Sequence, residues 1–70
     1  MNIKKSFGKR VKQLRTGKGW SQENLALNAD LDRTYIPSIE KGERNVSIEV
    51  IQKLSRAFEI KISELLKEIE

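Results

Sequence analysis

Apolar residues recur three or four positions apart near the start of the chain, which predicts an amphipathic helix over residues 3–16. The positions expected to face inward are Ile3, Phe7, Val11 and Leu14. Gly17 and Gly19 follow, and glycine readily adopts the left-handed backbone that closes a helix. Gly8 lies inside the helix, where glycine weakens it, and a close contact with a neighbouring helix would explain its presence.

Two shorter helices are predicted next, with a polar break between them. Ser21 is a good N-cap for a helix over residues 21–28, and the third helix, residues 33–41, is expected to be capped by Asp32. Gly42 is expected to end the third helix. The inward positions of the two helices are Leu25, Ala26 and Ala29 in the first and Ile36 and Ile39 in the second. Two short helices joined by a tight turn indicate a helix-turn-helix motif.

Two further helices complete the chain, the first over residues 48–58 with Ser47 as its cap and the second over about residues 62–69. Their inward positions are Ile48, Ile51, Leu54, Ala57 and Phe58, followed by Ile62, Leu65, Leu66 and Ile69. Trp20, in the connection after the first helix, is expected to pack into the core. No stretch alternates as a strand does. The sequence therefore predicts an all-α fold, with five helices around one core in a single domain spanning residues 1–70.

Pro37 interrupts the third predicted helix. Counted from residue 33, it would be the fifth helical residue, where its missing N–H removes a bond to the Arg33 carbonyl and its ring crowds that turn. We therefore expect a kinked or frayed first turn, which affects the aim of Arg33 and Thr34. On this basis Pro37→Ala should raise the melting temperature.

Charge is distributed unevenly along the chain. The net charge is +4, yet residues 1–18 carry seven bases and no acid, while residues 19–70 carry seven bases and all ten acids. This asymmetry indicates an end that faces a polyanion, and a solvated basic helix face is the equally good alternative.

The composition excludes several kinds of chemistry. Because the chain has no Cys and no His, disulfides, thiolate metal sites, imidazole bases and most zinc sites are excluded. Asp30 and Asp32 have no nucleophile or base beside them, so we expect no enzyme, no metal, no cofactor and no small-molecule ligand. With no long apolar run and no signal-peptide pattern, the chain is expected to be cytoplasmic and to have no membrane partner.

The pattern Ser21-Gln22, Leu25-Ala26, Ile39-Glu40 and Gly42 resembles the Cro/phage-repressor (XRE) helix-turn-helix family. Leu14-Arg15 before this pattern, and Ser47, Leu54 and Leu65-Leu66 after it, extend the resemblance over nearly the whole chain. Within the family, LDRTYI…IEKGERNVS is most similar to the controller proteins of restriction–modification systems. The resemblance implies a five-helix lambda-repressor-like DNA-binding domain whose second and third helices form the helix-turn-helix.

The resemblance also implies roles for individual residues. Gln22 falls where the family contacts a phosphate, and Arg15 and Glu40 fall where it forms an internal ion pair. Arg33, Thr34 and Ser38 fall where the family reads base edges, and Tyr35 is next to them. Arg44 falls where the family contacts the DNA backbone or a neighbouring base. The planar donor fork of arginine suits guanine O6 and N7, whereas hydroxyl groups specify a base weakly.

Each of these roles has a simpler alternative. Arg33 can contact phosphate alone, Gln22 can be an ordinary surface residue, Tyr35 can be a packing residue, and Arg44 can be a solvated loop residue.

The expected partner is double-stranded DNA, bound by a homodimer at two half-sites about one helical turn apart. Apolar residues near the end of the chain can cover the core, form the dimer seam, or do both: Ile60, Ile62, Leu65, Leu66 and Ile69. The predicted function is sequence-specific transcription regulation, by blocking polymerase or recruiting it. The alternative is an antitoxin-like protein-interaction module on the same fold, whose usual mark is an additional tail.

Overall fold

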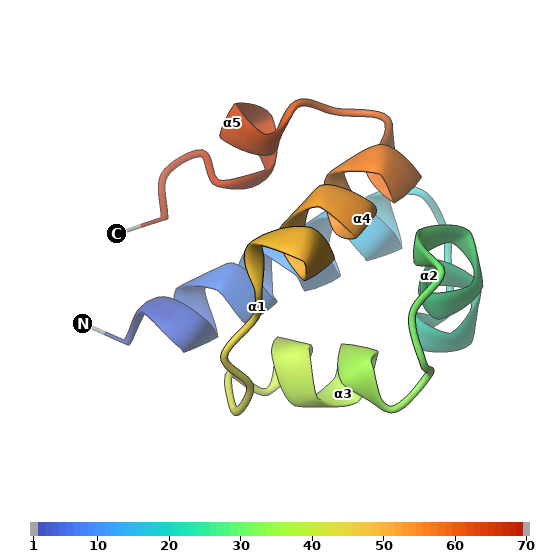
Figure 1. The fold of residues 1–70 in the computed structure, drawn as a ribbon, viewed down its shortest axis with the longest axis horizontal. Coiled ribbons are helices and arrows are strands. Elements are labelled where there is room, and N and C mark those ends of the chain that lie inside the picture. Colours follow the sequence, from blue (N-terminus) through green and yellow to red (C-terminus); the bar gives the residue numbers. More distant parts are fainter. Residues whose placement is uncertain (1, 70) are drawn as a thin grey trace.

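The computed structural model describes residues 2–69, which form five helices and contain no strand. The helices are α1 (Ile3–Gly17), α2 (Gln22–Ala29), α3 (Tyr35–Glu40), α4 (Ile48–Phe58) and α5 (Ile62–Leu65). As Figure 1 shows, α1 and α4 run across the middle of the molecule, α3 lies below them and α5 above them. The predicted all-α, five-helix fold is confirmed. No described helix is both long enough and apolar enough to cross a bilayer.

One apolar core lies between these helices, and every helix contributes to it. Its buried members are Phe7, Val11, Leu25, Ala26, Ala29, Ile36, Ile39, Leu54, Phe58 and Leu65. Trp20 packs on the edge of this core as predicted, with its ring stacked on that of Phe58 at a centroid separation of 5.9 Å. Because burial of apolar surface is the main favourable contribution to folding, this shared core holds the short helices in place.

Short polar side chains cap the helix starts. Ser21 Oγ accepts a hydrogen bond from the Asn24 backbone amide, and Asn24 Oδ1 accepts one from the Ser21 backbone amide, which makes a capping box. Ser47 likewise caps α4 through the amide of Val50. These two predicted caps are confirmed, and α2 and α4 begin and end within one residue of the predicted bounds.

The start of α3 differs from the prediction. The helix begins at Tyr35, two residues later than expected, because Asp32 Oδ1 accepts hydrogen bonds from the Thr34 amide and hydroxyl at 2.9 and 2.7 Å. The Tyr35 amide bonds to the Asp32 carbonyl at 3.0 Å, so residues 32–35 form a tight turn. Pro37 is therefore the third helical residue and not the fifth. The first amides of a helix have no partner within the helix, so Pro37 removes no hydrogen bond. The expectation that Pro37 removes a bond to the Arg33 carbonyl is therefore wrong.

Four residues predicted to face inward are exposed: Ile3, Ile48, Ile62 and Leu66. Ile3 and Ile48 are 59% and 79% exposed because each is the first residue of its helix, beyond the reach of the neighbouring helices. The last helix is also shorter than predicted, since α5 ends at Leu65 and residues 66–69 leave the helix. Ile62 and Leu66 are exposed, which corrects their predicted inward orientation.

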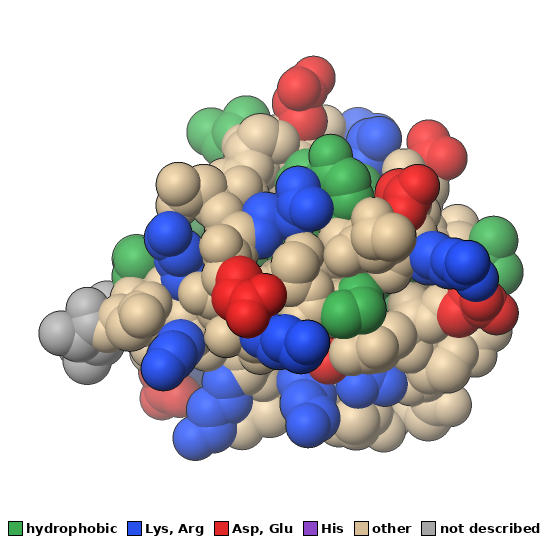
Figure 2. All heavy atoms as spheres, turned by 90° about the horizontal axis from the view of Figure 1, so that it is seen from below, with side chains coloured by type: hydrophobic (Ala, Val, Ile, Leu, Met, Phe, Trp, Pro, Cys, Tyr) green, Lys and Arg blue, Asp and Glu red, His purple; other side chains and the backbone are tan. Residues whose placement is uncertain are grey.

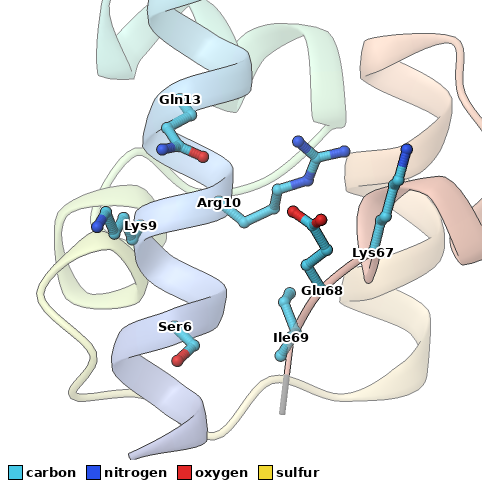
Figure 3. A pocket seen from close by; sticks show the side chains of 7 residues that line it. All are labelled: Ser6, Lys9, Arg10, Gln13, Lys67, Glu68 and Ile69. Carbon is cyan, nitrogen blue, oxygen red and sulfur yellow. The ribbon is translucent and has the colours of Figure 1, made fainter.

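The segment after α5 folds back along α1, so residues 67–69 lie beside the first half of that helix (Figure 1). Arg10 of α1 holds the end of α5 in place: Nη2 donates to the Glu64 carbonyl at 2.7 Å and Nε to the Leu65 carbonyl at 3.3 Å. Figure 3 shows Arg10 reaching across the hollow that separates α1 from this segment, with Glu68 beside it. Arginine thus satisfies carbonyls that the short α5 leaves open at its end.

Helices α1 and α3 approach each other closely at Gly8. A Cβ atom at this position would collide with the Ile39 carbonyl oxygen and lie 2.9 Å from that of Glu40. The contact expected from the presence of glycine in the helix is therefore confirmed. The recognition-helix candidate α3 rests directly on the backbone of α1.

Candidate nucleic-acid interface

The outer surface of α3 carries polar groups above two buried isoleucines. Ile36 and Ile39 are 0% and 1% exposed, whereas Thr34 is exposed and the Arg33 side chain is 77% exposed. Arg33 and Thr34 lie in the turn that leads into α3, and their exposed side chains face away from the core into which Ile36 and Ile39 point. Figure 2 views the molecule from this side and shows Lys and Arg side chains spread across much of the face.

The starts of α2 and α3 meet at a shallow hollow on this face. The residues that line it are Gln22, Glu23, Arg33, Thr34 and Pro37. Arg33 Nη1 lies 3.7 Å from Glu23 Oε2, and both side chains are mostly exposed, so this ion pair holds Arg33 only weakly. Gln22 and Arg33 are thus brought together, with the N-terminus of α2 beside them. That N-terminus carries partial positive charge and unpaired amides, which suit a phosphate.

The Gln22 side chain also forms a hydrogen bond with Glu40, on the side that faces the protein interior. Its Nε2 donates to Glu40 Oε1 at 3.1 Å, while Arg15 Nε donates to Glu40 Oε2 at 2.7 Å and Arg15 Nη2 to Oε1 at 3.1 Å. The Arg15 and Glu40 side chains are only 11% and 5% exposed. Arg15 and Glu40 therefore support the surface from beneath and do not lie on it.

Ser38 is less open than the sequence suggested. Arg44 Nε donates to Ser38 Oγ at 2.8 Å, and the Arg44 guanidinium carbon lies 4.1 Å from the centroid of the Tyr35 ring. All three residues are half-buried. The structure therefore groups Tyr35, Ser38 and Arg44 at the C-terminal side of the surface, apart from Arg33 and Thr34 at its N-terminal side.

The pKa of Asp32 is lowered from its ordinary value. The first cause is the hydrogen bond from the Thr34 amide, the second is the bond from the Thr34 hydroxyl, and the charges of Arg33 and Arg44 add to them. Because these groups stabilise the charged carboxylate, Asp32 stays ionised and holds the turn that leads into α3.

Lys41 belongs to the same surface and was missed from the sequence. It is exposed and lies seven residues after Thr34, a spacing that returns to the same side of a helix. That spacing was the signal that could have identified it. Lys5 of α1 lies at the same end of α3, in contact with Gly42. No group of acidic side chains among residues 2–69 is arranged to hold a metal ion.

Comparison with known proteins agrees with this geometry. A family model described as helix-turn-helix matches residues 11–65. The chain is 48% identical over 66 residues to Control protein C.BamHI of Bacillus amyloliquefaciens, covering 93% of this chain and 82% of that protein. It is 49% identical over 70 residues to Control protein C.MunI of a Mycoplasma species, covering 99% and 95%.

The fold of the chain also matches that of a solved controller protein. The crystal structure of the restriction-modification controller protein C.AhdI from Aeromonas hydrophila matches with a TM-score of 0.85 and 48% sequence identity, over 89% of this chain and 94% of that one. The family model spans both helices of the candidate interface and the core beneath them. The chain therefore belongs to the XRE-type helix-turn-helix family of DNA-binding transcriptional regulators and resembles the restriction–modification controller proteins.

Proposed function

We propose that this chain acts as a homodimer that binds an operator with two half-sites and controls the genes of a restriction–modification system. Each copy would place α3 in the major groove, and regulation would follow from occupancy of the operator, by blocking polymerase or recruiting it. Such a regulator works where bacterial DNA lies, in the cytoplasm. The names of C.BamHI, C.MunI and C.AhdI as control or controller proteins support this assignment.

The observation that carries the proposal is the exposure of Arg33 and Thr34 above the buried Ile36 and Ile39. An arginine at the leading end of α3 can present two parallel donors to guanine O6 and N7, a pattern that only G·C offers in the major groove. The N-terminus of α2, beside Gln22, would bind a backbone phosphate and set the register of α3.

The proposed dimer contact lies at the other side of the molecule, around α5 (Figure 1). Ile62 and Leu66 are 40% and 36% exposed, and Ile60 and Ile69 are half-buried against the core. Adjacent apolar side chains left partly open to solvent favour association of two copies. A two-fold dimer would present two recognition helices to two equivalent half-sites.

Selection of bound sites from a randomised duplex library tests the proposal most directly. The expected result is a sequence of two related half-sites, with their centres about 10 base pairs apart or a multiple of this spacing. Arg33→Ala should then lose about 1–3 kcal/mol of preference at one base pair in each half-site and little at the others. Equal weakening on every duplex would show that Arg33 contacts phosphate alone.

Sedimentation measures the dimer separately. The wild-type chain is expected to sediment as a dimer at micromolar concentration, and Leu66→Glu as a folded monomer, because Leu66 is at the surface of one copy. Leu27→Glu is the matched control, since Leu27 is 76% exposed on α2 and lies outside the proposed contact. A wild-type chain that remains monomeric at and above micromolar concentration would reject the dimer.

A further inference from the structure

Three lysines form a row along one side of α1, outside the helix-turn-helix. Lys5, Lys9 and Lys12 are spaced four and three residues apart, so their side chains leave the helix on neighbouring turns of the same side. All three are exposed, and this row is called the lysine stripe below. At about 1.5 Å of rise per residue, the stripe extends for about 10 Å along the helix axis.

Three other cations in the first eighteen residues are occupied by contacts within the protein. Arg10 donates to two carbonyl groups at the end of α5, and Arg15 pairs with a buried carboxylate of α3. Lys18 lies over the Trp20 ring, 5.3 Å from its centroid. Among residues 2–69, by contrast, no lysine side chain of the stripe takes part in a hydrogen bond or an ion pair. The stripe therefore keeps its charge available to a partner.

No carboxylate of α1 offsets the charge of the stripe, because residues 1–18 contain no acid. Figure 3 shows Lys9 on the side of α1 opposite to Arg10 and Glu68, so the acids of the C-terminal segment lie away from it. Like charges one turn apart on a helix repel each other and weaken the helix. A partner that carries a row of negative charges would remove this repulsion, which points to a polyanion.

The lysine stripe borders the candidate interface at the end of α3. Lys5 lies against Gly42, and the exposed Lys41 precedes that glycine. Gly8 touches backbone carbonyl groups of α3, and the stripe lysines on either side of it in sequence, Lys5 and Lys12, are each one turn away. Figure 2 shows Lys and Arg side chains spread across this face. The positive charge at the end of α3 therefore extends onto α1.

We propose that the lysine stripe is a second, sequence-independent contact with duplex DNA, which binds the phosphate backbone beside the base pairs that α3 would read. Each DNA strand carries about one phosphate per 3.4 Å of axis, so a stripe of about 10 Å spans about three phosphates. Lysine offers a point charge without the planar donor fork of arginine, which suits a backbone and specifies no base. Continuity with α3 favours duplex DNA over another polyanion.

This inference rests on the proposed function for the docking of α3, and the salt dependence of binding tests it separately. The full chain is compared with the variant Lys9→Gln/Lys12→Gln, whereas Lys5 is kept because it packs against the end of α3. The variant Lys53→Gln/Arg56→Gln is the matched control, since it removes two charges from exposed positions of α4. Dissociation constants are measured at several salt concentrations on the duplex selected from a randomised library and on a duplex of shuffled sequence.

The stripe variant is expected to flatten the plot of log dissociation constant against log salt concentration by roughly 2 to 4 in slope. Each phosphate contact contributes about 0.9 to this slope, and two lysines are lost from each copy of a dimer. Both duplexes should weaken by the same factor, so the ratio of their dissociation constants should stay within about twofold of wild type. The control should change the slope by less than about 1. The melting temperature of the stripe variant should not fall, because the substitutions relieve repulsion.

Four results would overturn the inference. An unchanged slope, or an equal change in the control, would leave the stripe without a specific contact. A changed ratio between the two duplexes would mean that these lysines read bases, and a clear fall in melting temperature would give them a structural role. A single-stranded RNA of equal length that loses more affinity than either duplex would assign the stripe to RNA. None of these results affects a selected operator, whereas a library without any preferred site would contradict the proposed function even if the slope on shuffled DNA fell as expected.

Discussion

Arg15 and Glu40 form a two-point ion pair between α1 and α3, with Nε–Oε2 at 2.7 Å and Nη2–Oε1 at 3.1 Å. The same carboxylate accepts a bond from Gln22 of α2, and Arg15 also donates to the Trp20 carbonyl at 2.7 Å. One acidic side chain therefore connects three helices beneath the candidate DNA-binding surface. A charge-assisted bidentate pair of this kind fixes direction as well as distance.

Glu40→Ala should lower the free energy of unfolding by about 3–5 kcal/mol, because it leaves the buried Arg15 charge without its carboxylate partner. Urea denaturation measures this difference. Lys53→Ala is the control, since it removes the Lys53–Asp30 pair, which is exposed and 3.9 Å long, and should change stability by less than about 1 kcal/mol. Similar losses for the two variants would show that burial does not strengthen the Arg15–Glu40 pair.

Gly8→Ala should destabilise the fold even though alanine favours helix by about 1 kcal/mol over glycine. The added methyl would meet the carbonyl oxygens of Ile39 and Glu40, which are backbone atoms and cannot rotate away. Gly17→Ala, at the end of the same helix, meets nothing within 4 Å and should be neutral or slightly stabilising. Melting temperatures of the two variants give the comparison, and a rise for both would contradict the tight contact.

Pro37→Ala should lower the free energy of unfolding slightly, by about 0.4–1 kcal/mol, because proline restricts the unfolded chain at a position it fits. This reverses the expectation from the sequence, since Pro37 is the third residue of α3 and lacks no bond. Lys41→Pro is the control: the Lys41 amide bonds to the Pro37 carbonyl at 3.0 Å, so a proline there should cost about 3 kcal/mol. A clear gain in stability for Pro37→Ala would restore the original expectation.

The lowered pKa of Asp32 predicts a pH dependence of stability. When the folded pKa lies below the unfolded one, the group stabilises the fold above the unfolded pKa, and this contribution is lost as pH falls through the folded pKa. Wild type should therefore lose part of its stability as pH falls below about 4, the ordinary carboxyl range. Asp32→Asn can still accept from Thr34 but cannot titrate, so its melting temperature should fall less over this range. A constant difference between the two proteins from pH 6 to pH 2 would contradict this assignment.

The helix positions that the sequence predicted well are those with local causes. Ser21 and Ser47 cap their helices through amides three residues ahead, and the glycines after α1 and α3 provide the positive φ at Gly19 and Gly42. The start of α3 was placed wrongly because Asp32 uses the same side-chain acceptor in a turn that it would use in a helix cap. Sequence alone does not distinguish these two uses.

The candidate surface was predicted in part for a similar reason. Helical periodicity placed Ile36 and Ile39 inside and left Thr34 outside, because it depends only on spacing. The covering of Ser38 by Arg44 depends on how the loop after Gly42 turns back, which tertiary contacts decide. Ile3 and Ile48 were misplaced because periodicity does not tell where the neighbouring helix ends.

The contact of α3 with α1 at Gly8 leaves α3 no room to move closer to α1 at this point. If α3 reads DNA as proposed, two operators of different sequence would meet nearly the same protein shape. The adjustment falls to the double helix, whose bending and groove width vary with sequence at base pairs that no side chain touches. Flexible pyrimidine–purine steps between the two proposed half-sites would then contribute to affinity although no side chain contacts them.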